Sequence, residues 1–322
     1  MTETEGRLRL TILGGYLGSG KTTWLRHQLH AGAFGRVHVV VNEAAEIPVD
    51  DALLGGAEGP TVLAGGCVCC TAGADLVKAL RQLCDRRSQS DDPSQRLERV
   101  ILETSGLADP APIVALLQAD PILTRHIVIS DIIVAVDAAH GLAQLAAEPL
   151  GRRQVEAADQ LIVTKLDAAD PAEVARLQLT LRTLNPGAAL SGSVMGSATT
   201  LPAPPIGTRP ADLPALVGGE PAPLLPVRLS LGNDPDWSAL GVWVSALLHA
   251  RGDEIVRVKG VVRTPAGRLL LQTVRKVVQP PEILPTDDSR DGLDNGIVVI
   301  GRGFDQNDLR LSFQHFTGVA QT

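Results

Sequence analysis

Residues 8–30, LRLTILGGYLGSGKTTWLRHQLH, decide the fold. They begin with a short β-rich run at 8–13 and then pass through a loop that contains four glycines. They end with the segment 21–30, in which Leu25 and Leu29 lie on one face of a helix. This stretch therefore predicts the order strand, glycine-rich loop and helix.

Short apolar runs and helical patterns alternate after this stretch. The runs of strand length lie at 37–41, 61–63, 100–102, 132–136 and 161–163, and the helical patterns at 74–86, 110–118, 138–147 and 171–184. Strands that alternate with helices form a mostly parallel sheet that is covered by helices on both faces. We therefore predict an α/β domain over residues 1–190.

The composition changes after this domain. Residues 191–224 are rich in Gly, Ser, Ala and Pro and show neither the helical nor the strand period of apolar residues, which is typical of a linker. Further predicted elements follow: a strand at 225–231, a helix at 236–250, a hairpin from 254–263 and 268–274, a strand at 296–300 and a helix at 305–316. Residues 225–322 thus form a smaller C-terminal α+β domain in this prediction.

Charge and hydropathy exclude two classes of partner. The formal net charge of −7 gives no basic surface for nucleic acid, whose phosphates need clustered Lys and Arg. No apolar run approaches the ~20 residues that cross a bilayer. The first residues, MTETEGR, lack the basic and then apolar order of a secretory signal. We expect a cytoplasmic protein that binds neither nucleic acid nor membranes.

Residues 15–22, GYLGSGKT, fit the pattern G-x-x-x-x-G-K-[ST] between a strand and a helix, so the first domain is predicted to be a P-loop NTPase domain. In such a loop backbone N–H groups surround the β-phosphate, the lysine reaches the β and γ oxygens, and the hydroxyl takes Mg²⁺. Lys21 is therefore expected to be catalytic and Thr22 to bind Mg²⁺. The other expected nucleotide contacts in the loop are Gly15, Gly18, Ser19, Gly20 and Thr23.

A second element, Glu103-Thr104-Ser105-Gly106, follows the strand that begins at Arg99. A carboxylate at the end of a strand is usually a solvated terminus, but beside a P-loop it suits the outer sphere of Mg²⁺. We expect Glu103 to support Mg²⁺ and the reaction, and Gly106 to offer its N–H to the γ-phosphate.

The segment Thr164-Lys165-Leu166-Asp167 follows a third strand and has the position of a guanine-recognition loop. The Asp167 carboxylate can accept from N1–H and the N2 amino group of guanine, donors that adenine lacks, and Lys165 can lie along the base. A site built on such hydrogen bonds can discriminate by roughly 10⁴-fold against a base that lacks these donors. Guanine-recognition loops usually carry Asn where this chain has Thr164. We expect GTP to be preferred over ATP.

Three of the four cysteines, Cys67, Cys69 and Cys70, occur in the six residues GGCVCC at 65–70. Their thiolates can converge on one soft or borderline metal ion, with Zn²⁺ the default and Co²⁺ a relative, and three ligands leave one position open. A redox switch and a packed turn are the alternatives at this stage. Cys84, on an amphipathic helical pattern, is expected to be a packing residue.

The ordered motifs GGYLGSGKTT at 14–23, GGCVCC at 65–70, ETSGLADP at 103–110 and TKLD at 164–167 resemble those of the CobW-like (COG0523) subgroup of the G3E P-loop GTPases. Val41-Asn42-Glu43 with Glu46 and Asp50 is similar to the switch segment of that family, and residues 257–260, RVKG, resemble a signature of its C-terminal domain. The resemblance covers nearly the whole chain.

This resemblance implies a GTPase that binds GTP, Mg²⁺ and a divalent transition metal, Zn²⁺ or Co²⁺, and delivers the metal to a client metalloprotein. Cys67, Cys69 and Cys70 would hold the metal, with an oxygen from Glu46. The family's usual Phe-Gly is Ala44-Ala45 here, and a family glycine is Pro48.

Two hypotheses from other classes compete with a GTP-dependent metallochaperone. One is a regulatory GTPase whose cysteines sense oxidation and whose output is a protein interaction. The other is a P-loop kinase that transfers the γ-phosphate of ATP to a small molecule. If the protein is a redox-sensing GTPase, the isolated protein should hold no metal. If it is a kinase that uses ATP, Asp167 should not be needed for nucleotide binding.

Overall fold

The computed structural model describes residues 6–42, 61–63, 73–90, 92, 96–214, 225–232, 236–252, 254–264, 267–274, 276–279, 281–284 and 295–320. The chain divides into two compact units, Arg7–Gly219 and Glu220–Thr322, the latter together with Met1–Gly6. None of the helices within the described ranges has the length and apolarity that a membrane span requires.

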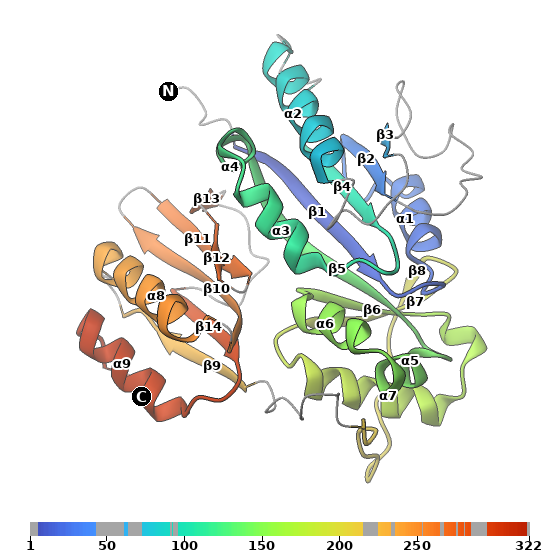
Figure 1. Ribbon diagram of the computed structural model, residues 1–322. Coiled ribbons are helices and arrows are strands. Elements are labelled where there is room, and N and C mark those ends of the chain that lie inside the picture. Colours follow the sequence, from blue (N-terminus) through green and yellow to red (C-terminus); the bar gives the residue numbers. More distant parts are fainter. Residues whose placement is uncertain are drawn as a thin grey trace. The chain divides into compact units, whose positions relative to one another are not determined.

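The first unit is built on a sheet whose strands, among the described residues, follow the order β3-β2-β4-β1-β5-β6-β7-β8 (Figure 1). Its strands are β1 (Leu8–Gly15), β2 (Val37–Asn42), β3 (Thr61–Val62), β4 (Arg99–Thr104), β5 (Ile127–Asp137), β6 (Gln160–Thr164), β7 (Ala189–Val194) and β8 (Ser197–Thr199). Every pair is parallel except β7 with β8. Its helices are α1 (Lys21–His30), α2 (Gly73–Gln89), α3 (Pro110–Gln118), α4 (Pro121–His126), α5 (Gly141–Ala147), α6 (Pro149–Ala157) and α7 (Pro171–Leu184).

Both faces of this sheet are covered by helices. Successive side chains of a strand point to opposite faces, and Ile12 and Leu13 of the central strand β1 are both fully buried. Leu13 packs against Leu25 of α1. Parallel crossovers are right-handed, so α2 and α3 lie on the opposite face from α1, and Figure 1 shows them in front of β4 and β1. The mostly parallel, helix-covered sheet predicted from the alternation is confirmed.

Two helices of the first unit were not predicted. Each begins with a proline directly after an acidic residue, at Asp120-Pro121 in α4 and at Glu148-Pro149 in α6. Proline suits the first helical turn because the N–H that it lacks has no intrahelical partner there. α4 spans only 6 residues, too few for a clear 3.6-residue period, and the 9 residues of α6, PLGRRQVEA, include only two large apolar residues, Leu150 and Val155. Tertiary packing stabilises such short helices more than propensity does.

The linker expected over 191–224 begins later than we predicted, because β7 and β8 extend the sheet to Thr199. β7 (ALSGSV) and β8 (SAT) consist mostly of Ala, Gly, Ser and Thr, and all three residues of β8 are exposed. With so few large apolar residues, neither strand has the continuous apolar run or the long alternation that identifies a strand in a sequence.

The proline-rich segment that follows is tied to the first unit. The buried Arg152 of α6 donates from Nη2 to the carbonyl of Pro214 at 2.8 Å. Gln178 Nε2 donates to Pro202 O at 3.0 Å, and the Ala211 N–H donates to Thr180 Oγ1 at 2.8 Å. Carbonyls outside regular structure are open acceptors. Residues 202–214 are therefore held along α6 and α7 and are not a free linker.

The second unit is a smaller α+β domain, as predicted. Its strands are β9 (Leu225–Ser230), β10 (Ile255–Thr264), β11 (Gly267–Val274), β12 (Val277–Val278), β13 (Glu282–Leu284) and β14 (Gly296–Gly301), and its helices are α8 (Trp237–Arg251) and α9 (Gln306–Thr317). All its strand pairs are antiparallel, and the predicted hairpin turns where Thr264 pairs with Gly267. The two helices meet at Trp243 and Phe313, whose rings are perpendicular with centroids 4.9 Å apart.

Candidate nucleotide-binding site

The neighbouring parallel strands β4, β1, β5 and β6 have their carboxyl ends at one edge of the first unit's sheet. β1 pairs with β4 through Leu13 and Glu103, and with β5 through Gly15 and Ala135. After β1 the chain passes over one face of the sheet, through α1, to β2. After β4 it passes over the other face, through α3, to β5. The carboxyl ends of β1 and β4 are therefore a topological switch point. Open α/β sheets bind ligands at this place.

The loop after β1 is shaped by glycines. Gly15, Gly18 and Gly20 have φ values of 133°, 71° and 83°, which other residues rarely adopt. A Cβ on Gly15 would lie 2.4 Å from the carbonyl oxygen of Ala135, so only glycine fits there. α1 begins directly after Gly20, which makes no side-chain capping bond. The N–H groups of the first helical turn are therefore available to an anion.

A buried polar atom in this loop also favours a ligand. Ser19 is fully buried, and its Oγ has no hydrogen-bond partner among the residues that the structure describes. Buried polar atoms without a partner are uncommon. The glycine loop, the helix start and this hydroxyl fit a bound phosphate chain.

Lys21 and Thr22 lie at the start of α1 and turn in different directions. Lys21 is 6% exposed, and its Nζ donates to the carbonyls of Gly15 at 2.9 Å and Tyr16 at 3.2 Å. The ammonium group thus lies against the P-loop. The Thr22 hydroxyl donates to Oε1 of Glu103, whose side chain is almost fully buried. A hydroxyl beside a carboxylate is an oxygen donor set that Mg²⁺ accepts, so the residues present fit the expected ion.

Gly106 lies directly against the P-loop. A Cβ on this residue would be 2.6 Å from the backbone N of Leu17. Its carbonyl accepts a hydrogen bond from Gln154 Nε2 of α6 at 3.2 Å. Sequence reasoning missed Gln154 because α6 itself was missed, and only the acid-proline pair at 148–149 could have located that helix.

The segment at 164–167 is linked to the P-loop by two side chains. Thr164 donates from its hydroxyl to Ser19 O at 2.7 Å and to Val136 O at 3.2 Å. Lys165 Nζ donates to Gly18 O at 2.7 Å. A hydroxyl has one hydrogen, so Thr164 connects this loop to the P-loop and has no further donor for a base.

Asp137, at the end of β5, is a second residue that the sequence analysis missed. Its carboxylate is 3% exposed and accepts from Lys165 Nζ at 2.7 Å. It also accepts from the N–H groups of Ala139 at 2.8 Å and His140 at 3.2 Å. Burial alone would raise the pKa of Asp137, but these hydrogen bonds, led by that from Lys165, outweigh it and lower the pKa. An acid after an apolar strand, the signal that identified Glu103, was present here too.

Lys165 is held between these partners in an unusual backbone conformation. Its φ is 57°, in the left-handed region, and its side chain is 44% exposed. Asp167 lies in the adjoining 3-10 helix (Leu166–Ala168) and is exposed. The ammonium group is fixed by Gly18 and Asp137, which leaves the aliphatic part of Lys165 free to lie along a planar group.

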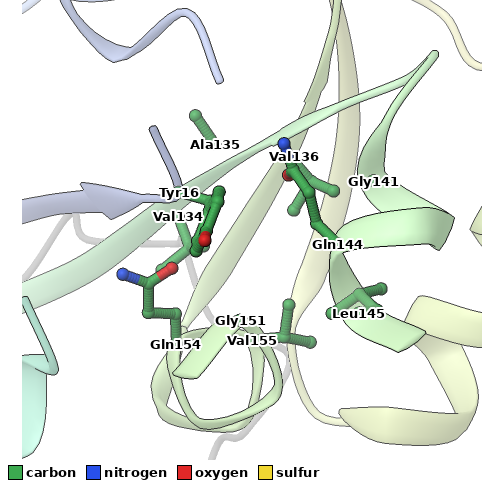
Figure 2. Close-up of a pocket in the computed structure, with 10 residues that line it drawn as sticks. All are labelled: Tyr16, Val134, Ala135, Val136, Gly141, Gln144, Leu145, Gly151, Gln154 and Val155. Carbon is green, nitrogen blue, oxygen red and sulfur yellow. The ribbon is translucent and has the colours of Figure 1, made fainter. Parts of the chain in front are cut away.

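A small pocket adjoins the P-loop between β5 and helices α5 and α6 (Figure 2). It holds about 260 Å³ of empty space, part of which is open to solvent, and Tyr16, Gln144 and Gln154 contribute polar atoms to its lining. Most of its lining is apolar and comes from β5, α5 and α6, whereas a phosphate chain needs the N–H groups of the P-loop and the start of α1. We therefore place the candidate site at the P-loop on chemical grounds.

The predicted transition-metal ligands Cys67, Cys69, Cys70 and Glu46 lie outside the described residues, as does the switch segment beyond Asn42. Among the described residues no group of three or more His, Cys, Asp or Glu could hold a metal ion. Cys84 is buried in α2, as expected for a packing residue. Burial raises the pKa of its thiol to about 11.

Comparison with protein families gives two matches that together cover most of the chain. Residues 9–191 match the model described as "CobW/HypB/UreG, nucleotide-binding domain", and residues 227–317 match "Cobalamin synthesis protein cobW C-terminal domain". The first match alone spans more than half of the 322 residues.

Individual proteins similar to this chain carry names that mention zinc. The zinc chaperone YjiA of Escherichia coli is 28% identical over 319 residues, which cover 95% of this chain and 98% of YjiA. The zinc chaperone CobW of Pseudomonas aeruginosa is 29% identical over 318 residues, covering 85% of this chain and 82% of that protein. A crystal structure of Zn(II)-bound YjiA GTPase has a TM-score of 0.60 at 22% identity, covering 96% of this chain and 99% of that one. This last likeness concerns the fold.

Proposed function

The chain belongs to the CobW/HypB/UreG family of P-loop GTPases, as its motifs predicted, and from this premise we propose that it is a GTP-dependent metallochaperone. It binds a divalent transition metal, Zn²⁺ or Co²⁺, at Cys67, Cys69 and Cys70 and releases it to a client protein when GTP is hydrolysed. The arrangement of Lys21, Thr22 and Glu103 around the P-loop is the observation that carries the nucleotide part of this proposal.

In the proposed reaction water attacks the γ-phosphorus of GTP, and GDP and phosphate leave. Lys21, now bound to two P-loop carbonyls, turns to the β and γ oxygens and stabilises the charge that develops there. Gly106 offers its N–H to the γ-phosphate. Thr22 would hold Mg²⁺ and Glu103 would support it, and the ion would supply further charge neutralisation at the phosphates.

Guanine recognition is assigned to the loop after β6. Asp167 accepts from the guanine donors, and the stem of Lys165 lies along the ring while Asp137 and Gly18 hold its ammonium group. Thr164 keeps the loop attached to the P-loop through Ser19 O. The residue in the usual place of Asn thus contributes to the loop's position, and base selection depends on Asp167.

The topology favours communication between the cysteines and the nucleotide. β3 is parallel to β2, and the Leu63 N–H after it donates to Val41 O at 2.9 Å. The chain therefore leaves β3 at the same edge of the sheet as the P-loop, and GGCVCC begins two residues after Leu63. Three thiolates leave one position of a tetrahedral ion open, which suits a metal that is to be transferred.

Replacing Cys69 with serine tests the division between the two sites. We expect the Cys69→Ser variant to bind GDP and a non-hydrolysable GTP analogue with wild-type affinity and to lose at least tenfold in Zn²⁺ affinity, since a hydroxyl replaces a thiolate ligand. A competition titration with a chromophoric chelator measures the metal, and Cys84→Ser is the matched control because Cys84 is buried in α2. Wild-type Zn²⁺ affinity in Cys69→Ser, or loss in Cys84→Ser alone, would mean that the metal site is misassigned.

A further inference from the structure

The loop after β4 is fixed by a side chain from a distant helix. Gln154 of α6 is 1% exposed, and its Nε2 donates to Gly106 O at 3.2 Å and to Ala108 O at 2.8 Å. A primary amide nitrogen carries two hydrogens, so both donors are used on this one loop. Buried amides of this kind specify one arrangement of the groups that they join.

The same loop is confined on its P-loop side. A Cβ on Gly106 would lie 2.6 Å from Leu17 N and 2.8 Å from Leu17 Cα. Gly106 therefore touches the P-loop backbone while its carbonyl is bound to Gln154. The Gly106 N–H shares a planar peptide unit with the carbonyl of Ser105, which accepts from the Ala108 N–H at 2.9 Å. Gln154 holds the same turn at the carbonyls of Gly106 and Ala108, so the direction of the Gly106 N–H is restricted.

The preceding residue of α6, Arg153, contacts the far end of the loop. Arg153 Nε donates to Asp109 Oδ2 at 3.1 Å. The other carboxylate oxygen of Asp109 accepts from Ala111 N at 3.0 Å and caps α3. The Arg153 side chain is 47% exposed, and exposed ion pairs contribute little, so the buried amide of Gln154 is the principal constraint.

Figure 2 shows Gln154 beside Tyr16 of the P-loop on one side of the small pocket, with Gln144 on the other side. Gln154 comes from the middle of α6 and Gln144 from α5. The two glutamines thus line one pocket, but the hydrogen bonds to Gly106 and Ala108 come from Gln154.

We propose that Gln154 is a positioning residue for GTP hydrolysis, which holds Gly106 where its N–H meets the γ-phosphate. The proposal rests on the GTP site proposed above. GDP has no γ-phosphate, so the hydrogen bonds from Gln154 should affect GTP binding and turnover while leaving GDP binding unchanged.

Two substitutions separate this role from a general effect on folding. Gln154→Met keeps the length of the side chain and removes both donors, and Gln154→Glu keeps its shape but places a carboxylate against two carbonyl oxygens. Gln144→Met is the control from the same pocket. The full-length chain is used with Mg²⁺, and the measurements are the Kd for GDP, the Kd for a non-hydrolysable GTP analogue, kcat and KM for GTP, and the melting temperature.

We expect Gln154→Met to raise the Kd for the GTP analogue about tenfold and to lower kcat about tenfold, which is the scale expected for the loss of two neutral hydrogen bonds. GDP affinity stays within about twofold of wild type, Gln154→Glu loses at least as much as Gln154→Met, and Gln144→Met matches wild type. Equal losses for GDP and the analogue, or a folded Gln154→Met and Gln154→Glu with wild-type kcat, would overturn the proposal. A wild-type chain that neither binds nor hydrolyses GTP would instead contradict the GTPase function itself.

Discussion

Replacing Lys21 with alanine should lower kcat for GTP by about 10³-fold, close to complete loss of turnover. The magnitude follows from removing a positioned charge from a site where charge develops in the transition state, which costs roughly 10²–10³-fold for a single neutral donor. Lys21 is 6% exposed at the start of α1 and lies against the loop that is expected to hold the phosphates. Phosphate release under saturating GTP is the measurement.

Lys78→Ala is the matched control for this result. Lys78 is an exposed lysine on α2, so its loss changes the net charge of the chain by the same amount as the loss of Lys21. We expect wild-type turnover in this variant. If Lys21→Ala retained kcat within about twofold of wild type, the nucleotide would have to bind away from the P-loop.

Replacing Asp167 with alanine should reduce the preference for GTP over ATP from roughly 10⁴-fold to near parity. The carboxylate accepts two donors that adenine lacks, and the exposed position of Asp167 after β6 leaves it open to a base. Thr164 directs its only hydroxyl hydrogen to backbone carbonyls of the protein, so it is not available to donate to the base, and we expect the discrimination to rest on Asp167.

The measurement is competition of ATP and of GTP against a fluorescent guanine nucleotide. Glu173→Ala, an exposed acid on α7 whose ion pair with Arg176 lies at the surface, is the control and should keep full selectivity. Equal binding of ATP and GTP by the wild-type chain, with no change in Asp167→Ala, would favour the kinase hypothesis.

Local patterns predicted most elements because their signals are short-range. The helices expected at 110–118 and 171–184 are α3 and α7 with the same bounds. Each combines an aspartate N-cap and a first-turn proline with apolar residues at helical spacing, whereas α4 has the same cap but only 6 residues. β5 begins at Ile127, five residues before the strand expected at 132–136. Ser130 and Asp131 interrupt its apolar run, and their contacts with Thr11 of β1 and Arg99 of β4 could not be inferred from the run itself.

The parts of the site that were missed depend on contacts between distant residues. Gln154 binds Gly106, which lies 48 positions away, and the pairing of Asp137 with Lys165 joins the ends of two strands. No local period indicates either contact. The P-loop differs because its glycines, lysine and threonine are adjacent in sequence and act together. The role of the cysteines at 67, 69 and 70 stays a prediction.

The central claim is that nucleotide binding controls metal binding. The most direct test is a titration of the reduced, full-length chain with Zn²⁺ and, separately, with Co²⁺, in the presence of Mg²⁺ with either GDP or a non-hydrolysable GTP analogue. We predict that the analogue raises metal affinity 5- to 150-fold over GDP, the usual range of coupling between two sites. Equal metal affinity with both nucleotides would contradict the account.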